Sequence, residues 1–107
     1  MGATILEFIK SCVRQQKIIW TYHVNMRLQE RHIPREAILS SVDSYEIIEQ
    51  YLQDKYLPSY LIYATYKRQI IHIHIATDRQ NENIRMITAY KPTLDKWKED
   101  FKTRRKP

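Results

Sequence analysis

One stretch of the chain constrains the fold more than any other, namely IIHIHIAT at positions 70–77. Its isoleucines alternate with His72 and His74, so a β-strand places the isoleucines on one face and both imidazoles on the other. The isoleucine face needs covering by other elements. We therefore expect helices on that face and both histidines on the barer side of a sheet, where a ligand can reach them.

Three further stretches show the same period of two: YEIIEQYL at 45–52, SYLIYATY at 59–66 and IRMITAY at 84–90. Short connections at 67–69 and 78–83 join the last three strands of the set into an antiparallel meander.

The N-terminal part of the chain has helical periodicity. Thr4 and Glu7 form a capping box that opens a first helix, with an apolar stripe made of Ile5, Phe8, Ile9, Cys12 and Val13. Residues 18–20 form a short apolar bridge, after which Thr21 caps a second helix over about 22–32. Pro34 suits the first turn of a short third helix.

The C-terminal part predicts one more helix. Pro92 stops the last strand, and Leu94, Trp97 and Phe101 then fall on one stripe as core-facing anchors. The predicted fold is α+β, with N-terminal helices packed on one face of a four-stranded, mainly antiparallel sheet, and a C-terminal helix. With 107 residues, of which 43% are hydrophobic, the chain fits a single domain over 1–107.

The location expected for this protein is the cytoplasm. Cys12 is the only cysteine, so no intrachain disulfide can form, which suits a reducing compartment. The start MGATILEFIK lacks the basic start and long apolar stretch of a secretory signal. No apolar run approaches the ~20 residues that cross a bilayer, so we expect no membrane partner.

The charge favours a polyanionic partner. Eighteen Lys and Arg against twelve Asp and Glu give +6, and nucleic acid is the commonest partner of a small basic domain. Residues 91–107 hold seven of these bases against three acids. Arg104, Arg105 and Lys106 then form a mobile cationic end that holds an RNA backbone or, in the alternative, a solvated tail.

A polar ridge runs along the second predicted helix. His23, Arg27 and Arg31 are spaced by four, so they share one face, with the two arginines ~6 Å apart along the axis. This spacing suits a phosphate clamp, because the planar guanidinium binds phosphate bidentately. The alternative is a surface ridge of ion pairs, for example between Arg27 and Glu30.

Three motifs resemble one family of small bacterial domains of unknown function. TYHVNMRLQERHIPREAI resembles its opening Thr-x-His-Ala-x-x-Arg-Met-x-Glu-Arg-x-Ile pattern, and IIHIHIATD resembles one of its closing strands. ITAYKPTLDKWKEDFKTRRK is similar to its Tyr-x-Pro…Trp…Arg-Arg ending, so the resemblance runs over 21–106 and leaves 1–20 as an N-terminal helix and bridge. The departures are Val24 for Ala, Leu28 for Met, and Pro34 where Ser or Thr is common.

The family is grouped with the RelE- and BrnT-like toxins of bacterial toxin–antitoxin pairs. The resemblance therefore implies a helix-plus-sheet ribonuclease fold whose open sheet face meets RNA, with a cognate antitoxin as protein partner. The pattern matches this chain at His23, Arg27, Glu30, Arg31, His72, Tyr90, Pro92 and Trp97.

Metal-free RNA cleavage needs a base for the 2′-hydroxyl, an acid for the leaving 5′-oxygen, and cations for the phosphate. We expect proton transfer from His23, His72 or Tyr90, and phosphate binding by Arg27, Arg31, Arg104 and Arg105. Structural alternatives stay open: His23 bonding backbone at the helix start, the strand histidines as polar fillers (favoured for His74), and Tyr90 packing on Trp97. No third ligand beside the His-x-His pair is fixed by spacing, so no metal or other cofactor is expected.

Three functions follow from these residues. The first is a toxin-like, metal-independent endoribonuclease acting on messenger RNA, free or on a ribosome. The second is a non-catalytic nucleic-acid or protein-binding module on the same fold. The third is a structural partner that oligomerises through its eight tyrosines.

Overall fold

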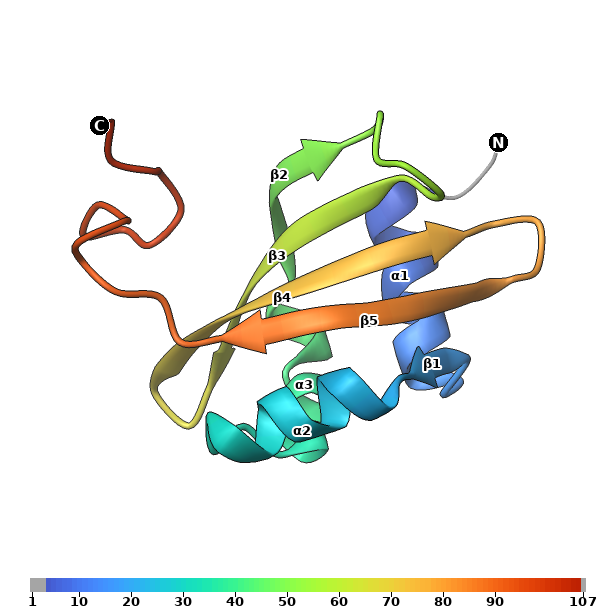
Figure 1. Cartoon of the computed structure of the whole chain (residues 1–107), viewed down its shortest axis with the longest axis horizontal. Helices are drawn as coiled ribbons and strands as arrows, with labels where there is room; N and C mark the ends of the chain where they lie inside the picture. The colour runs from blue at the N-terminus through green and yellow to red at the C-terminus, as the bar shows by residue number, and fades with distance from the viewer. Residues whose placement is uncertain (1–3, 107) are drawn as a thin grey trace.

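The computed structural model describes residues 4–106, and residues 1–3 and 107 of the predicted domain lie outside this range. It is a mixed α+β fold with three helices and a five-stranded sheet (Figure 1). The elements, in chain order, are α1 (Ile5–Arg14), β1 (Ile18–Trp20), α2 (Tyr22–Glu30), α3 (Arg35–Ser40), the short 3₁₀ helix η1 (Val42–Ser44), β2 (Glu46–Tyr51), β3 (Ser59–Tyr66), β4 (Gln69–Asp78) and β5 (Asn83–Tyr90).

The sheet has the order β1-β5-β4-β3-β2. Strands β3, β4 and β5 form the predicted antiparallel meander, and β2 extends it by pairing antiparallel with β3. Strand β1 pairs in parallel with residues 84–86 of β5. The prediction of four strands was wrong because β1, expected as a bridge, is only three residues long. Three residues are too few to show an alternating pattern.

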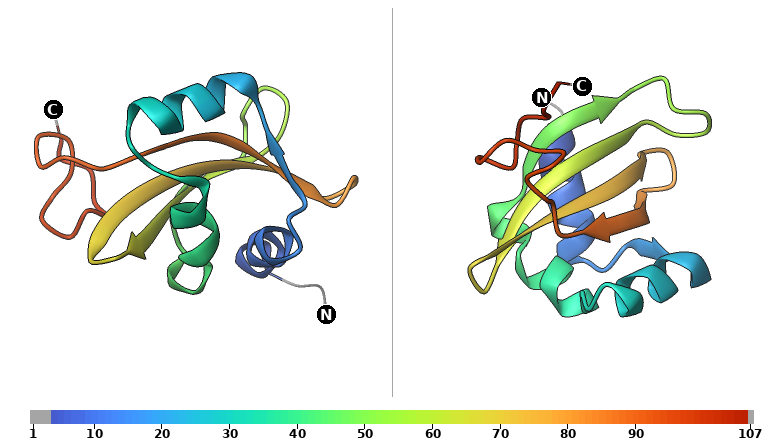
Figure 2. Two further views of the ribbon diagram at one scale, coloured as in Figure 1. Left: turned by 90° about the horizontal axis from the view of Figure 1, so that it is seen from below. Right: turned by 60° about the vertical axis from the view of Figure 1, so that its left-hand side comes forward.

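The isoleucine face of β4 is buried as predicted. Ile71, Ile73 and Ile75 are at most 2% exposed and belong to one core with residues of all three helices. Figure 2 shows α1 and α3 on one side of the sheet, while α2 runs beside β5 at the sheet edge. Thr4 and Thr21 cap α1 and α2 as expected, each accepting a hydrogen bond from a backbone amide of the first turn.

The chain reverses direction without glycine throughout the described range. The two-residue turn between β3 and β4 has positive φ at both Lys67 (47°) and Arg68 (66°), and Gln16 and His32 take positive φ just after α1 and α2. Such left-handed residues end helices and close hairpins, but any side chain with a Cβ adopts them at a cost.

The predicted C-terminal helix is wrong. Residues 91–106, here called the C-terminal strap, form turns and one isolated bridge between Trp97 and Arg104. The Asp100 carboxylate accepts hydrogen bonds from the amides of Lys102 and Thr103, and this local turn competes with helix formation. Leu94 is 51% exposed rather than core-facing.

The strap covers part of the sheet face opposite the isoleucines, as the right-hand view of Figure 2 shows. Trp97 is 1% exposed and packs edge-on against His72, with ring centroids 4.5 Å apart. The expectation that both histidines lie on a bare face is therefore wrong for His72, which is 0% exposed.

Candidate nucleic-acid interface

Three adjoining hollows meet at Tyr90, and together they form a surface that we call the Tyr90 groove. The first hollow, about 420 Å³, lies between α2 and β5 and is lined by His23, Arg27, Arg31 and Tyr90, among others. The second, about 400 Å³, lies between β5 and the strap, and the third, about 370 Å³, lies over β3 and β4. Arg31 is shared by the first two hollows and Arg104 by the last two, so the groove is continuous.

The groove is rich in cations, some of which have no partner within the described part of the fold. Its second hollow adds Lys91, Lys96 and Arg104 to Arg31. Within residues 4–106, the side chains of Arg27, Lys91 and Lys96 make no hydrogen bond or ion pair. The Arg27–Glu30 ion pair, considered as the alternative to a clamp, is therefore not formed. Exposed cations without partners keep their binding capacity for an external anion.

Arg31 is both a structural residue and a member of the groove. Its Nη1 donates hydrogen bonds of 2.8 Å to the hydroxyl of Thr88 and to the carbonyl oxygen of Ala89. Because β1 pairs only with residues 84–86, this part of β5 is an open edge whose backbone groups need partners. Arg31 supplies a hydrogen-bond donor to the Ala89 carbonyl on that edge. This contact holds its side chain at the junction of two hollows.

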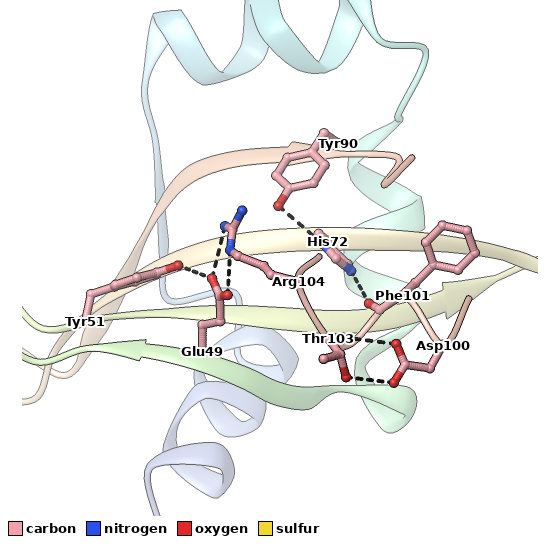
Figure 3. A network of polar contacts seen from close by, with 8 residues as sticks. All are labelled: Glu49, Tyr51, His72, Tyr90, Asp100, Phe101, Thr103 and Arg104. Carbon is pink, nitrogen blue, oxygen red and sulfur yellow. Dashed lines mark hydrogen bonds and ion pairs between the residues drawn. The ribbon is translucent and has the colours of Figure 1, made fainter. Parts of the chain in front are cut away.

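Tyr90 lies at the centre of the groove, because it lines all three hollows. Its hydroxyl points toward the His72 ring (Figure 3). The two residues are directly paired in the β4–β5 register, and the Tyr90 hydroxyl lies 3.3 Å from Nδ1 of His72. On the other side of the ring, Nε2 donates a 2.7 Å hydrogen bond to the carbonyl oxygen of Phe101. A carbonyl can only accept, so neutral His72 carries its proton on Nε2 and accepts from the tyrosine hydroxyl through Nδ1.

Burial sets the protonation state of this pair. It lowers the pKa of His72, although the Phe101 hydrogen bond and the nearby Glu49 act in the opposite direction. Burial also raises the pKa of the Tyr90 hydroxyl, against the effect of Arg104. At neutral pH the pair is therefore uncharged, and Tyr90 rather than His72 is the member that reaches the groove.

Arg104 is anchored rather than part of a mobile end. Its guanidinium donates two hydrogen bonds to the Glu49 carboxylate, which also accepts one from Tyr51 (Figure 3). The guanidinium also lies 4.5 Å from the Trp97 ring centroid. The hydrogen bond to Glu49 is the main cause of the raised pKa of Arg104. Arg105 folds back onto carbonyl oxygens of the strap itself, at Leu94 and Trp97, and does not line the groove.

The structure thus brings together His23, Arg27, Arg31, Tyr90 and Arg104 on one surface, places His72 beneath it, and leaves Arg105 outside. His74, expected as a polar filler, lines the third hollow with Tyr90 and Arg104. The sequence indicated only that His74 lies on the face of the strand opposite the isoleucines. Its position beside Tyr90 depends on the pairing of three strands.

The described residues bring no three His, Cys, Asp or Glu side chains together in a group that could hold a metal ion. Among residues 4–106, none of the helices has the length and apolar character needed to cross a membrane.

Comparison with family models shows the family to which this chain belongs. The model of a domain of unknown function, DUF4258, matches residues 20–91, so the chain is a member of the DUF4258 family. The matched range contains α2, the whole meander and Tyr90, whereas α1 and the strap beyond Lys91 lie outside it. No curated protein and no solved structure matches the chain.

Proposed function

We propose that this protein binds single-stranded RNA in the Tyr90 groove and cleaves it without a metal, as a toxin-like endoribonuclease. The observation that carries the proposal is the groove itself, in which Arg27, Lys91 and Lys96 have no protein partner among residues 4–106 and line hollows that share Tyr90. The grouping of the fold with RelE- and BrnT-like toxins is part of this proposal and rests on the sequence resemblance.

The charges of the groove suit an RNA backbone. Arg27, Lys91 and Lys96 are exposed, and Arg31 and Arg104 are held in place by protein contacts. Cations along a groove follow a phosphate chain, while an aromatic side chain such as Tyr90 can stack a base. A single strand fits better than a duplex, because its bases are free to stack.

The chemistry of cleavage requires groups that transfer protons at the scissile phosphate. Tyr90 reaches the groove and His23 lies exposed on its rim. His72 cannot touch RNA while the strap covers it, so its part in the proposal is to orient the hydroxyl of Tyr90. This burial weighs against direct catalysis by His72.

A non-catalytic binding module is the second candidate, and the same groove supports it. In that case the protein blocks a target, such as messenger RNA on a ribosome, without cutting it. Either function leaves room for a cognate antitoxin as protein partner. Co-purification from a host that expresses the neighbouring gene is the direct test of that partner.

The main experiment measures binding and scission of a labelled single-stranded RNA in EDTA. The wild type is compared with an Arg27→Ala/Lys96→Ala variant, and the matched control is Lys10→Ala/Lys17→Ala. The control removes the same charge from α1 and the residues after it, away from the groove. Since single-stranded RNA gives a salt slope of about 0.7 per phosphate contact, the groove variant should lower the slope by about 1.4.

The outcomes separate the candidates. Binding and scission that both fall in the groove variant, with the control unchanged, support the endoribonuclease. Salt-sensitive binding without scission supports the binding module instead. No affinity for RNA at about 0.15 M salt, or equal losses in the two double variants, overturns both.

A further inference from the structure

A second histidine, His74, has the hydrogen-bonding arrangement of an oriented base. Its Nε2 lies 2.9 Å from the hydroxyl oxygen of Ser59, and that hydroxyl lies 2.6 Å from the Asp54 carboxylate. An ionised carboxylate can only accept hydrogen bonds, so Ser59 donates its single proton to Asp54. The serine oxygen must then accept from Nε2–H of His74.

This chain of hydrogen bonds fixes the tautomer of His74. With the proton held on Nε2, the neutral ring carries its free lone pair on Nδ1. Ser59 is 0% exposed, so water does not compete for the hydrogen bonds of its hydroxyl. The ring of Tyr51 lies edge-on to the imidazole, with centroids 5.4 Å apart, and limits its rotation.

The free nitrogen of His74 is accessible. Among residues 4–106, Asn83 Oδ1 is the one buried side-chain polar atom without a hydrogen-bond partner. Nδ1 of His74 has no partner in that range either, so it must reach solvent. His72 differs, because both of its ring nitrogens are occupied by protein groups.

The surroundings of His74 suit a base that acts at neutral pH. Burial lowers its pKa from 6.5, and the carboxylates of Asp54 and Glu49 oppose that effect. The other titratable or charged groups in contact with it or lining the same hollow are Tyr51, Tyr90 and Arg104. The ring is therefore uncharged at pH 7 and lies beside a guanidinium that can hold a phosphate.

We propose that His74 is the general base of the RNA cleavage assigned above, with Ser59 and Asp54 as its positioning residues. This inference rests on the proposed function and deepens it. Nδ1 takes the proton of the 2′-hydroxyl, and the 2′-oxygen forms a bond to phosphorus as the bond from phosphorus to the 5′-oxygen breaks. The Tyr90 hydroxyl gives up its hydrogen bond to His72 and donates its proton to the departing 5′-oxygen. The resulting phenolate regains a proton from the His74 imidazolium through solvent. The products are a 2′,3′-cyclic phosphate and a 5′-hydroxyl.

The test uses a DNA oligonucleotide with a single ribonucleotide, so that one 2′-hydroxyl is present, in EDTA between pH 5 and 9. His74→Gln should lower the single-turnover rate at pH 7 by about 100-fold or more. Affinity for the all-deoxy oligonucleotide should fall far less than the rate, because the cations of the groove stay in place. His32→Asn is the matched control, because His32 is exposed and lies outside the groove.

The positioning role has its own readout. Asp54→Asn changes an exposed residue and should lower both the rate and the pKa of His74, since it removes the neighbouring carboxylate charge. Nitrogen-detected NMR of the wild type should show the neutral His74 ring protonated on Nε2. The rate should rise with pH through the His74 pKa that NMR measures, and this rise should vanish in His74→Gln.

The outcomes are distinguishable from those of the proposed function. A wild type that cleaves, with His74→Gln cleaving equally fast, overturns the base assignment and leaves the endoribonuclease standing. A wild type that binds the oligonucleotide without cleaving it overturns both. A folded protein whose His74 is protonated on Nδ1 instead contradicts the assignment, whatever the rates are.

Discussion

Trp97 meets His72 edge-on at a ring-centroid distance of 4.5 Å, and this contact joins the C-terminal strap to the outer face of the sheet. Edge-on contacts of this kind stabilise beyond the area that they bury. The pair has a second consequence. It is the reason that a histidine on the side of the sheet without helices is nevertheless sealed from solvent.

Removing Trp97 should loosen the strap. We expect Trp97→Ala to lower the free energy of unfolding by about 3 kcal/mol, because a fully buried indole leaves a cavity. Urea unfolding measures the loss, and hydrogen exchange should show reduced protection in residues 97–105. Leu94→Ala, at a position that is 51% exposed, should change stability by less than about 0.5 kcal/mol. Equal effects of the two substitutions would contradict this account of the strap.

The Glu49–Arg104 pair should make strap attachment sensitive to acid. Burial by itself would raise the pKa of Glu49, but hydrogen bonds from Arg104 and Tyr51 outweigh it, and the pKa lies below the ordinary 4.5. A carboxylate with a depressed folded pKa stabilises the fold above pH 4.5, and this contribution is lost as pH falls through the folded value. The Arg104 side chain is 51% exposed, so the pair contributes at most about 1 kcal/mol.

A double-mutant cycle of Glu49→Gln and Arg104→Gln, measured by urea unfolding at pH 7 and pH 3, checks this prediction. The coupling free energy should be positive at pH 7 and smaller at pH 3. A coupling that stays the same at both values would show that the carboxylate charge has no part in it.

Protonation of His72 should destabilise the fold. Its folded pKa lies below 6.5 mainly because of burial, so the folded state binds fewer protons than the unfolded chain. Stability is then full above pH 6.5 and declines as pH falls below that value. Urea midpoints between pH 7.5 and 5.5 should show the decline, and His72→Gln should make it shallower while lowering stability at pH 7.5. His74, whose pKa is also lowered, accounts for the remaining slope.

Arg31 and Arg27 should separate stability from binding. Arg31→Ala removes the donor that satisfies the Ala89 carbonyl, and we expect a loss of about 1–3 kcal/mol together with weaker RNA binding. Arg27→Ala removes a side chain without partners in the described range, so stability should stay within about 0.5 kcal/mol while RNA affinity falls. Thermal unfolding and fluorescence anisotropy, measured on the same samples, give both quantities. Loss of stability in both variants, or in neither, would contradict the assignment of the β5 edge to Arg31.

Alternation and capping made much of the fold predictable. The strand over 59–66 was placed correctly to the residue, and Thr21 begins α2 as its side chain suggests. Both signals are local, because a strand shows its two faces in its own sequence and a cap depends on the first turn of its own helix. The predictions that were wrong concern elements whose structure depends on residues far away in the sequence. Strand β1 is formed by pairing with the edge of β5. The strap is not helical, and its residues Trp97 and Arg104 instead contact His72 and Glu49.

The same distinction explains the site. The spacing of Arg27 and Arg31 placed them correctly on one face of α2, and the structure added Tyr90 beside them. The burial of His72 could not be predicted from its own strand, because Trp97, which covers it, lies 25 positions further along the chain. Likewise, the importance of His74 depends on Ser59 and Asp54, which the pairing of β3 with β4 brings to its ring.

The turn at Lys67 and Arg68 is a site where substitution can raise the thermal stability of this protein. Both residues adopt the left-handed conformation that a tight two-residue hairpin requires, and Asn-Gly is the pair that adopts it most easily. Replacing Lys67-Arg68 with Asn-Gly should stabilise the protein by about 1 kcal/mol. The melting temperature should then rise by several degrees for a domain of this size. Neither residue lines the groove, so the stabilised variant should keep the groove unchanged. Destabilising substitutions at Tyr90 or His74 could then be studied in this variant without loss of the fold.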